Sequence, residues 1–575
     1  MDTVPALVER IRWQGVVLDA VQDRARLLGL DAAWPLAPVR LRVHRNHAFE
    51  FVQSPLTTYL AYAGFKPEWS ISDYDDSLAF AGIEAGLPAH VDAEILWLDF
   101  GRYQLEPNGI AAWLETRLAH LRSHSPAPIL LTGPFPSDGA IAPALAGLVS
   151  RTPGLRLLDM AAALGPLGER SLDPARAEFQ GTRLSRAAQL LVARELGLKW
   201  IPAAVAPRIK AIAIDLDNTL YSGVLGEDGP AGITVTNDHL RLQEALIALG
   251  EQGVLLTVVS KNEAVDVDRM FDERSDFKLR PSHLAASRVN WSPKATNIVE
   301  LAGQFNIAPS AFLMLDDNPG ELFATAQAVP GIAILQASED AATTVEHLSR
   351  FPGLFSFGSD STDSLRAADL RSAAERKTAL TAAVDQDPLA YLKALGTQIT
   401  LRADPPDEFQ RLCDVPKKTN QFNLALQRLK DGDVQRYIEA PDRCVVALEL
   451  RDKLSDSGNV GALFAHVEDD AIVVDELCIS CRALGRAVED IMIAEAIDFV
   501  SARLGGGHRN VAFAYRKGPR NAPALSWLKR MTGRELDVAI EGEGEETDSL
   551  HCLTMGMAEL RRGPEANALV GRQVG

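Results

Sequence analysis

Cysteine and long apolar runs are both scarce in this chain. Five cysteines among 575 residues are too few for a disulfide framework and fit a reducing cytoplasm. No stretch approaches the ~18 consecutive apolar residues that a membrane-spanning helix needs, and the opening residues lack the apolar core of a signal peptide. We therefore expect a cytoplasmic protein that does not use a membrane as a partner.

An excess of basic residues is also missing. Lysine and arginine number 58 against 77 aspartates and glutamates, which gives a formal net charge of −19. Nucleic-acid phosphates attract clusters of Lys and Arg, so nucleic acid is not expected as a partner. The chain does have ample apolar content, 47%, over a length that corresponds to about three or four domains.

Two aspartates, Asp215 and Asp217, follow an apolar run at 211–214. Because the chain begins to turn at the carboxyl end of a strand, both acids can converge on one cation and one phosphoryl group. Such a pair suits a nucleophile beside an acid/base, and the charge repulsion between carboxylate and phosphate calls for a divalent cation. An oxygen-rich site of this kind favours Mg²⁺. The alternative is that both aspartates only cap a turn.

Later segments supply further groups near the ends of predicted strands. Ser260 ends an apolar run and can hold a phosphoryl oxygen, and Lys294 is a compact cation that can neutralise nucleophile and phosphate. Asp316 and Asp317 follow the run at 311–315 and are natural metal ligands. In an open parallel sheet, ligands bind in the crevice outside the strand ends. The predicted metal ligands are Asp215, Asp217, Asp316 and Asp317. The alternative for Lys294 is a solvated surface charge.

The order Asp-x-Asp-x-Thr, Ser, Lys and Asp-Asp resembles the haloacid dehalogenase superfamily. This resemblance implies a Rossmann-like core in which Asp215, Asp217 and Lys294 are catalytic. The intervals between the motifs leave no room for a large cap domain, so we expect an open site that admits a bulky or tethered substrate. The glycine-rich stretch 222–229 is expected to form a hairpin flap beside the nucleophile.

The resemblance is more specific in four segments, which resemble the FkbH-like family. These segments are residues 215–229, 259–262, 290–298 and 315–319. Members make glyceryl-acyl carrier protein from 1,3-bisphosphoglycerate. The resemblance therefore implies Mg²⁺, a small phosphorylated substrate, and an acyl carrier protein with a phosphopantetheine arm as partner. The residues that it implies for substrate binding are Thr219, Ser260, Lys261 and Asn262. This chain departs from the family at Tyr221-Ser222-Gly223, where Trp-Gly-Gly is common, and after Pro319, where Glu-Arg is usual.

Matches at 417–424, 450–453 and 479–489 resemble the acetyltransferase-like (GNAT-like) α+β domain that follows in this family. A strand at 470–480 and an amphipathic helix at 486–497 are expected to enclose a turn. A helix start with glycine and arginines can cradle pyrophosphate or phosphopantetheine. The turn residues expected to bind substrate in this way are Arg482, Gly485 and Arg486.

Cys481 lies at the mouth of the same turn. A helix N-terminus and two guanidinium groups are expected to lower the pKa of its thiol, which makes it a plausible nucleophile that holds an acyl group as a thioester. No cysteine precedes Cys413 in the chain, so an acyl-cysteine has to form in the C-terminal region. The alternative is that Cys481 is a small buried hydrophobe. We expect the other cysteines, Cys413, Cys444, Cys478 and Cys552, to be core residues.

The N-terminal third contains four short apolar strands, which alternate with helical stretches and predict an α/β domain. The predicted strands are 39–43, 94–98, 128–132 and 155–159. Longer FkbH-like proteins carry an SGNH-like fold here, but this chain has no Gly-Asp-Ser motif, and His44 and His47 are expected to be loop residues. We therefore expect the N-terminal domain to have a scaffold or docking role rather than esterase activity. The predicted domains are 1–204 (N-terminal α/β, SGNH-like and degenerate), 205–350 (haloacid dehalogenase-like), 351–389 (helical linker), 390–560 (GNAT-like) and 561–575 (loose tail).

The predicted function is removal of phosphate from an acyl phosphate and transfer of its three-carbon acyl group to an acyl carrier protein, in polyketide or related secondary-metabolite biosynthesis. The alternative is a Mg²⁺-dependent phosphatase acting on a small metabolite or a phosphoprotein. Carrier proteins are usually acidic, so docking on an acidic enzyme needs a local basic patch. The candidate patch is 515–521 with Lys529, Arg530 and Arg534, which could equally be a solvated basic face.

Overall fold

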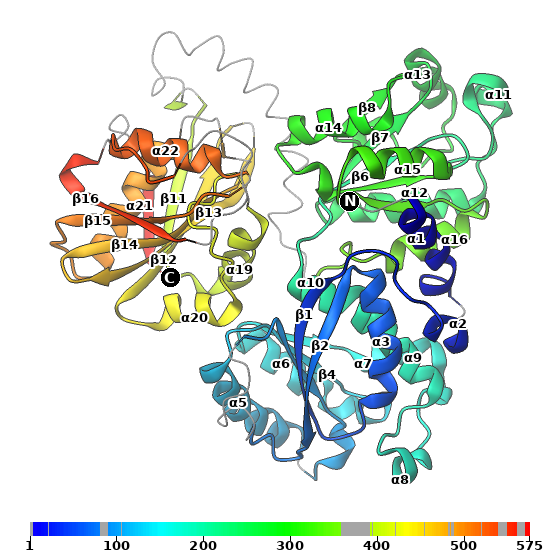
Figure 1. Ribbon diagram of the computed structural model, residues 1–575, viewed down its shortest axis with the longest axis horizontal. Coiled ribbons are helices and arrows are strands. Elements are labelled where there is room, and N and C mark those ends of the chain that lie inside the picture. Colours follow the sequence, from blue (N-terminus) through cyan, green and yellow to red (C-terminus); the bar gives the residue numbers. More distant parts are fainter. Residues whose placement is uncertain are drawn as a thin grey trace. The chain divides into compact units, whose positions relative to one another are not determined.

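The computed structural model describes residues 4–20, 22–80, 90–104, 106–357, 392–393, 395–419, 421–453, 455–480, 483–484, 488–518, 520–538, 549–560 and 570–574. The chain forms two compact units, Met1–Ser359 and Asp360–Gly575. The predicted multidomain α/β class is confirmed, because the first unit contains two parallel sheets flanked by helices and the second contains one mixed sheet (Figure 1). Among the described helices, none has the length and apolarity to cross a membrane.

The first sheet of the first unit is wholly parallel, in the order β2-β1-β3-β4-β5. Its strands are β1 (Ala37–Arg45), β2 (Phe65–Tyr74), β3 (Ala93–Trp97), β4 (Ile129–Thr132) and β5 (Leu155–Leu158). The chain begins with the helix α1 (Val4–Val17). The α-helices around the first sheet are α2 (Arg24–Leu28), α3 (Glu50–Tyr62), α5 (Pro107–His124), α6 (Ala142–Arg151), α7 (Met160–Leu164), α8 (Arg176–Gln180), α9 (Arg186–Glu195) and α10 (Ile201–Val205). Every residue of β3 and β4 is buried, as expected for a sheet covered on both faces.

Of the two histidines that we expect in a loop, His47 lies in the bend after β1 as expected, whereas His44 does not. His44 lies within β1, and its Nε2 is 3.0 Å from the buried carboxylate of Glu94. The His47 ring stacks on Trp97 at 4.8 Å, and its Nδ1 is 3.0 Å from Thr182 Oγ1. Burial lowers the pKa of His47 to about 3. The prediction is wrong for His44 because β1 continues to Arg45, past its apolar core, where the Glu94 carboxylate is a partner for the buried ring. The buried His47 ring has a partner at Nδ1, whereas its Nε2 has none among the described residues.

The second sheet is also parallel, in the order β10-β9-β6-β7-β8. Its strands are β6 (Ala211–Ile214), β7 (Leu255–Ser260), β8 (Ala286–Val289), β9 (Phe312–Asp316) and β10 (Ala333–Gln336). Its helices are α11 (Leu225–Gly232), α12 (Asn237–Glu251), α13 (Ala264–Glu273), α14 (Lys294–Phe305), α15 (Pro319–Ala328) and α16 (Ala341–Arg350). Only α11 and α12 lie between β6 and β7 in this fully described interval, so no large cap interrupts the core.

The expected hairpin flap at 222–229 is wrong, because this stretch leads into the helix α11. An isolated antiparallel bridge joins Ser222 to Thr234, and the helix fills the interval between them. Asp228 accepts the backbone N–H of Val224 at 2.8 Å, and acidic residues in a first turn favour a helix N-terminus. Gly229 has φ 64° and kinks the helix, so glycine is needed there for helix geometry rather than for a hairpin turn.

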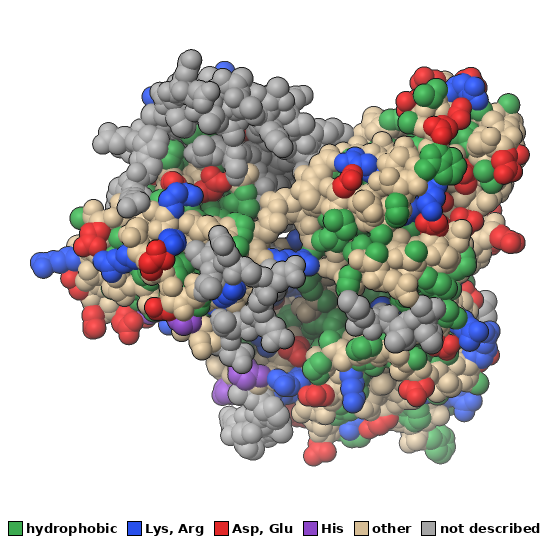
Figure 2. Space-filling model, turned by 45° about the horizontal axis from the view of Figure 1, so that its top comes forward, with side chains coloured by type: hydrophobic (Ala, Val, Ile, Leu, Met, Phe, Trp, Pro, Cys, Tyr) green, Lys and Arg blue, Asp and Glu red, His purple; other side chains and the backbone are tan. Residues whose placement is uncertain are grey.

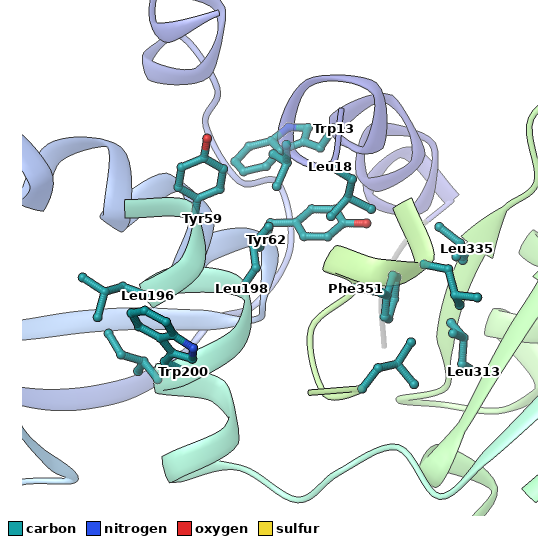
Figure 3. Packing of buried hydrophobic residues seen from close by; sticks show 14 of the residues in the cluster. Trp13, Leu18, Tyr59, Tyr62, Leu196, Leu198, Trp200, Leu313, Leu335 and Phe351 are labelled. Carbon is teal, nitrogen blue, oxygen red and sulfur yellow. The ribbon is translucent and has the colours of Figure 1, made fainter. Parts of the chain in front are cut away.

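One apolar core runs through both sheets of the first unit. Trp13 of α1 and Leu18 belong to the same buried cluster as Tyr62 of α3, Leu335 of β10 and Phe351, which lies just after α16 (Figure 3). The Trp13 ring is 1% exposed. The first unit is therefore held together by burial of a common apolar surface.

Polar contacts tie α1 to the second sheet as well. Gln14 donates from Nε2 to the carbonyl of Gln336 at 3.1 Å, and its Oε1 accepts the Gln336 N–H at 3.0 Å. Gln336 ends β10, an edge strand whose outer backbone groups need partners. The Gln14 side chain supplies both partners, so an N-terminal helix completes the edge of the second sheet.

The second unit contains a seven-stranded sheet in the order β16-β15-β14-β13-β12-β11-β17. Its strands are β11 (Gln398–Ala403), β12 (Arg443–Arg451), β13 (Asp456–Glu468), β14 (Ala471–Ile479), β15 (Asn510–Tyr515), β16 (His551–Gly556) and β17 (Val570–Val574). The α-helices α19 (Phe409–Lys418) and α20 (Asp431–Glu439) pack on one face, and α21 (Glu489–Arg503) and α22 (Ala522–Thr532) pack on the other.

Two sequence expectations fail in this sheet. The tail that we expect to be loose contains β17, which pairs in parallel with β11 from Ile399↔Val570 to Ala403↔Val574. Strand pairing of this kind depends on a free sheet edge, which composition does not reveal. Cys552 is exposed, whereas Cys413, Cys444 and Cys478 are buried as expected. Cys552 faces outward because it lies on the edge strand β16, in which buried and exposed residues alternate.

The candidate basic patch carries matching acids. Lys529 lies 2.7 Å from Glu535, Arg530 lies 2.6 Å from Asp490, and Arg534 lies 2.8 Å from Glu559. On the face shown in Figure 2, acidic and basic side chains are likewise intermixed over the described part of the chain. These three cations therefore have acidic partners within the chain, and docking of a carrier protein on the patch stays a prediction.

Candidate active site

The carboxyl ends of β6, β7 and β9 bring the predicted phosphoryl-transfer residues together. Asp215 directly follows β6, Ser260 ends β7 and Asp316 ends β9, and these three strands are neighbours in the sheet. Lys294 is the first residue of α14, which begins beside them. Because parallel strands end at the same edge of a sheet, residues separated by about a hundred positions share one site.

Lys294 lies between two buried carboxylates. Its Nζ is 2.8 Å from Asp215 Oδ1 and 2.6 Å from Asp316 Oδ2. The side chains of Lys294, Asp215 and Asp316 are 4%, 9% and 0% exposed, which excludes the solvated-surface alternative for the lysine. Ser260 Oγ donates to Asp215 Oδ1 at 2.8 Å, so Asp215 is oriented by a cation and a hydroxyl together.

The burial of these charges perturbs their pKa values. Burial, and then the neighbouring Asp215, raises the pKa of Asp316 to about 7. Burial also raises the pKa of Asp215 above its usual value, despite the nearby Lys294. Burial lowers the pKa of Lys294, but the two carboxylates outweigh that effect and raise it overall. The site therefore holds more negative charge than one lysine can balance, and a further cation would relieve the excess.

Three carboxylates could hold that cation. One oxygen from each of Asp215, Asp316 and Asp317 lies within 4.8 Å of the others, which is the one such group found in the part of the chain that the structure describes. An all-oxygen donor set fits Mg²⁺. Burial, and then Asp215, raises the pKa of Asp317 too. The hydroxyl of Thr219 is buried in the turn after β6 and has no hydrogen-bond partner among the described residues, so it is free to donate to a phosphoryl oxygen.

The carboxylate of Asp217, which we predict as a metal ligand, is not part of this acidic group. Asp217 Oδ1 accepts the hydroxyl of Tyr221 at 2.7 Å and the backbone N–H of Leu225 at 3.0 Å. Asp217 Oδ2 accepts from Asn262 Nδ2 at 3.0 Å. The turn continues at Asn218, directly after Asp217, where φ is 51°. Asp217 is thus held apart from the three carboxylates, in a position suited to acid/base work rather than metal binding.

Besides Ser260, two more of the predicted substrate-binding residues have protein partners. Asn262 Nδ2, besides contacting Asp217, lies 3.2 Å from Ser260 Oγ and so links two site residues. Lys261 Nζ is 2.6 Å from Glu321 Oε1, in the first turn of α15. Sequence reasoning missed the structural roles of Tyr221, Leu225 and Glu321. Only the position of Tyr221, four residues after Asp217 at the other end of the same turn, could have suggested a contact.

Four predicted residues of the acyl-transfer site lie outside the described residues. They are the predicted nucleophile Cys481 and the predicted phosphopantetheine-binding residues Arg482, Gly485 and Arg486. The flanking elements are described: β14 ends at Ile479, and α21 begins at Glu489, close to the predicted strand and helix. The acyl-transfer part of the site therefore stays a prediction.

The Lys294→Ala variant is expected to lose about 3–5 kcal/mol of unfolding free energy at neutral pH, because it leaves Asp215 and Asp316 buried without their cation. The loss is expected to shrink as the pH falls towards 4, where protonated carboxyl groups need no counter-charge. Urea unfolding at both pH values measures the effect. Lys278, whose side chain is 52% exposed, is the matched control, and Lys278→Ala is expected to change stability by less than about 1 kcal/mol. A Lys294→Ala variant as stable as wild type would contradict the buried triad.

No protein family and no curated protein matches the chain. Among solved structures, the N-terminal part of BF1531 from Bacteroides fragilis, which contains a phosphatase domain complexed with Mg, is 18% identical over 61% of this chain and 99% of that chain, with a TM-score of 0.46. A spermidine/spermine N-acetyltransferase from Vibrio cholerae is 12% identical over 28% of this chain and 95% of that chain, with a TM-score of 0.21. Scores this low carry no functional argument, so the site is interpreted from its own geometry.

Proposed function

We propose that this chain is a Mg²⁺-dependent enzyme that transfers a phosphoryl group from a small phosphorylated substrate to Asp215. The observation that carries the proposal is the buried Lys294 ammonium held between Asp215 and Asp316 at the edge of a parallel sheet. A structural ion pair needs one carboxylate. A third carboxylate, Asp317, adds charge that a bound cation would offset.

Each residue has a separate task in this reaction. Mg²⁺ held by Asp215, Asp316 and Asp317 would offset the charge of the nucleophile and the phosphoryl group. The Asp215 carboxylate, oriented by Lys294, forms a bond to phosphorus while the bond from phosphorus to the leaving oxygen breaks. Asp217 donates a proton to that oxygen and later takes a proton from the water that hydrolyses the aspartyl phosphate. The products are phosphate and the dephosphorylated substrate, with both aspartates restored.

We further propose that the substrate is an acyl phosphate of the 1,3-bisphosphoglycerate type. Attack at the acyl phosphorus would release a free carboxylate and lose the activation of the acyl group. In this scheme the thiolate of Cys481 therefore attacks the carbonyl carbon of the acyl phosphate. A C–S bond forms, and phosphate leaves with the electrons of the C–O bond. Asp215 acts on the remaining phosphate ester, which leaves the hydroxyl of a glyceryl group. The phosphopantetheine thiol of an acyl carrier protein then accepts that glyceryl group by thioester exchange.

Intact-protein mass spectrometry tests this scheme. After incubation with Mg²⁺ and 1,3-bisphosphoglycerate, the wild type is expected to gain the mass of one glyceryl group, and added acyl carrier protein is expected to remove it. Cys481→Ala is expected to release phosphate without gaining the adduct, whereas Cys413→Ala, which alters a buried cysteine, is expected to behave as wild type. Phosphate release without an adduct on any variant would favour the plain phosphatase instead.

A further inference from the structure

Tyr221 is a buried tyrosine beside the proposed acid/base. It lies in the turn after β6, is 0% exposed, and packs edge-on against Phe277 with ring centroids 5.9 Å apart. Its hydroxyl donates to Asp217 Oδ1 at 2.7 Å. A hydroxyl bond to an ionised carboxylate is among the stronger hydrogen bonds in proteins. Tyr221 therefore acts on the site through Asp217, without being one of the groups proposed to touch the substrate.

The two carboxylate oxygens of Asp217 differ in the number of hydrogen bonds that they accept. An ionised carboxylate offers about four lone-pair positions, two on each oxygen. Both positions on Oδ1 are used, one by Tyr221 Oη and one by the backbone N–H of Leu225. Oδ2 accepts one bond, from Asn262 Nδ2, and keeps one position. Only Oδ2 can therefore carry a proton without breaking an existing hydrogen bond.

We infer that Tyr221 is a positioning residue that restricts proton transfer to Oδ2 of Asp217, an inference that rests on the proposed phosphoryl transfer. By saturating Oδ1 from the buried side, Tyr221 keeps the carboxylate from rotating and leaves Oδ2 to deliver its proton to the departing oxygen. Proton delivery matters most for a strongly basic leaving group and least for a weakly basic one. Loss of Tyr221 therefore has a specific kinetic signature.

The experiment compares Mg²⁺-dependent hydrolysis of phenyl phosphate, which has a basic leaving group, with that of 4-nitrophenyl phosphate, whose leaving group is weakly basic. Tyr221→Phe keeps the ring against Phe277 and removes only the hydroxyl. Its kcat is expected to fall about tenfold or more on phenyl phosphate and by less than about threefold on 4-nitrophenyl phosphate, with both KM values unchanged. A general disturbance of the fold would lower both rates alike.

Tyr437→Phe is the matched control. Tyr437 is also buried and donates to a carboxylate, Asp475 Oδ2, at the same 2.7 Å, but it lies in the second unit. Both rates of this variant are expected to equal those of the wild type, and thermal unfolding checks that both variants are folded. Equal losses on the two substrates, or none, would overturn the role of Tyr221 alone. If the wild type hydrolysed neither substrate, the proposed function would fail and the role of Tyr221 with it.

Discussion

The Asp215→Asn variant is expected to lose phosphate release by at least about 10⁴-fold, because asparagine cannot replace the carboxylate that we propose as the nucleophile. The same variant is expected to be more stable than wild type at pH 8 without Mg²⁺. Burial raises the pKa of Asp215 in the folded protein, so its ionised form opposes folding. That penalty is absent below about pH 4, where the carboxyl is protonated in both states, and it grows as the pH rises.

Activity assays and thermal unfolding at pH 4 and pH 8 test both halves of this expectation. Mg²⁺ is expected to raise the unfolding temperature of the wild type more than that of Asp215→Asn, because the variant lacks one of the three proposed ligands. Asp272→Asn, which changes an exposed carboxylate on α13, is expected to leave rate and stability near wild type. A folded Asp215→Asn enzyme with a tenth of the wild-type rate would rule out Asp215 as the nucleophile.

The Trp13→Ala variant is expected to lose about 3–5 kcal/mol of unfolding free energy, the usual cost of removing a buried tryptophan. Trp13 packs edge-on against Trp34 at 4.8 Å and belongs to the core shared by both sheets of the first unit. Because that core is continuous, the two sheets are expected to unfold in one transition, at a lower urea concentration than in the wild type. Urea titration followed by tryptophan fluorescence and by phosphatase activity measures both.

Phe179 is the matched control for this prediction, since it is a large aromatic residue that is 87% exposed. Phe179→Ala is expected to change the unfolding free energy by less than about 0.5 kcal/mol. If Trp13→Ala shifted the fluorescence transition but left the loss of phosphatase activity at the wild-type urea concentration, the two sheets would be independent folding units.

The predicted strands agree closely with the structure where a strand and its end are set by residues adjacent in the chain. The runs before Asp215, Ser260 and Asp316 form strands, because short, continuous apolar segments bounded by polar residues are typical of buried parallel strands. Their carboxyl ends share one edge of the sheet by topology alone. Lys294 could be placed by resemblance, but its burial between two carboxylates could not.

The sequence by itself thus determined where strands end and which chemical groups stand at those ends, since both depend on residues adjacent in the chain. Only the tertiary structure decided which atoms meet: that Asp217 faces Tyr221 and Asn262 rather than the group of three carboxylates, that Lys261 pairs with Glu321, and that Gln14 completes the edge of β10. These contacts join side chains through space, and their partners are chosen by packing and by the need to satisfy buried polar groups. The order of residues in the sequence does not specify these partners.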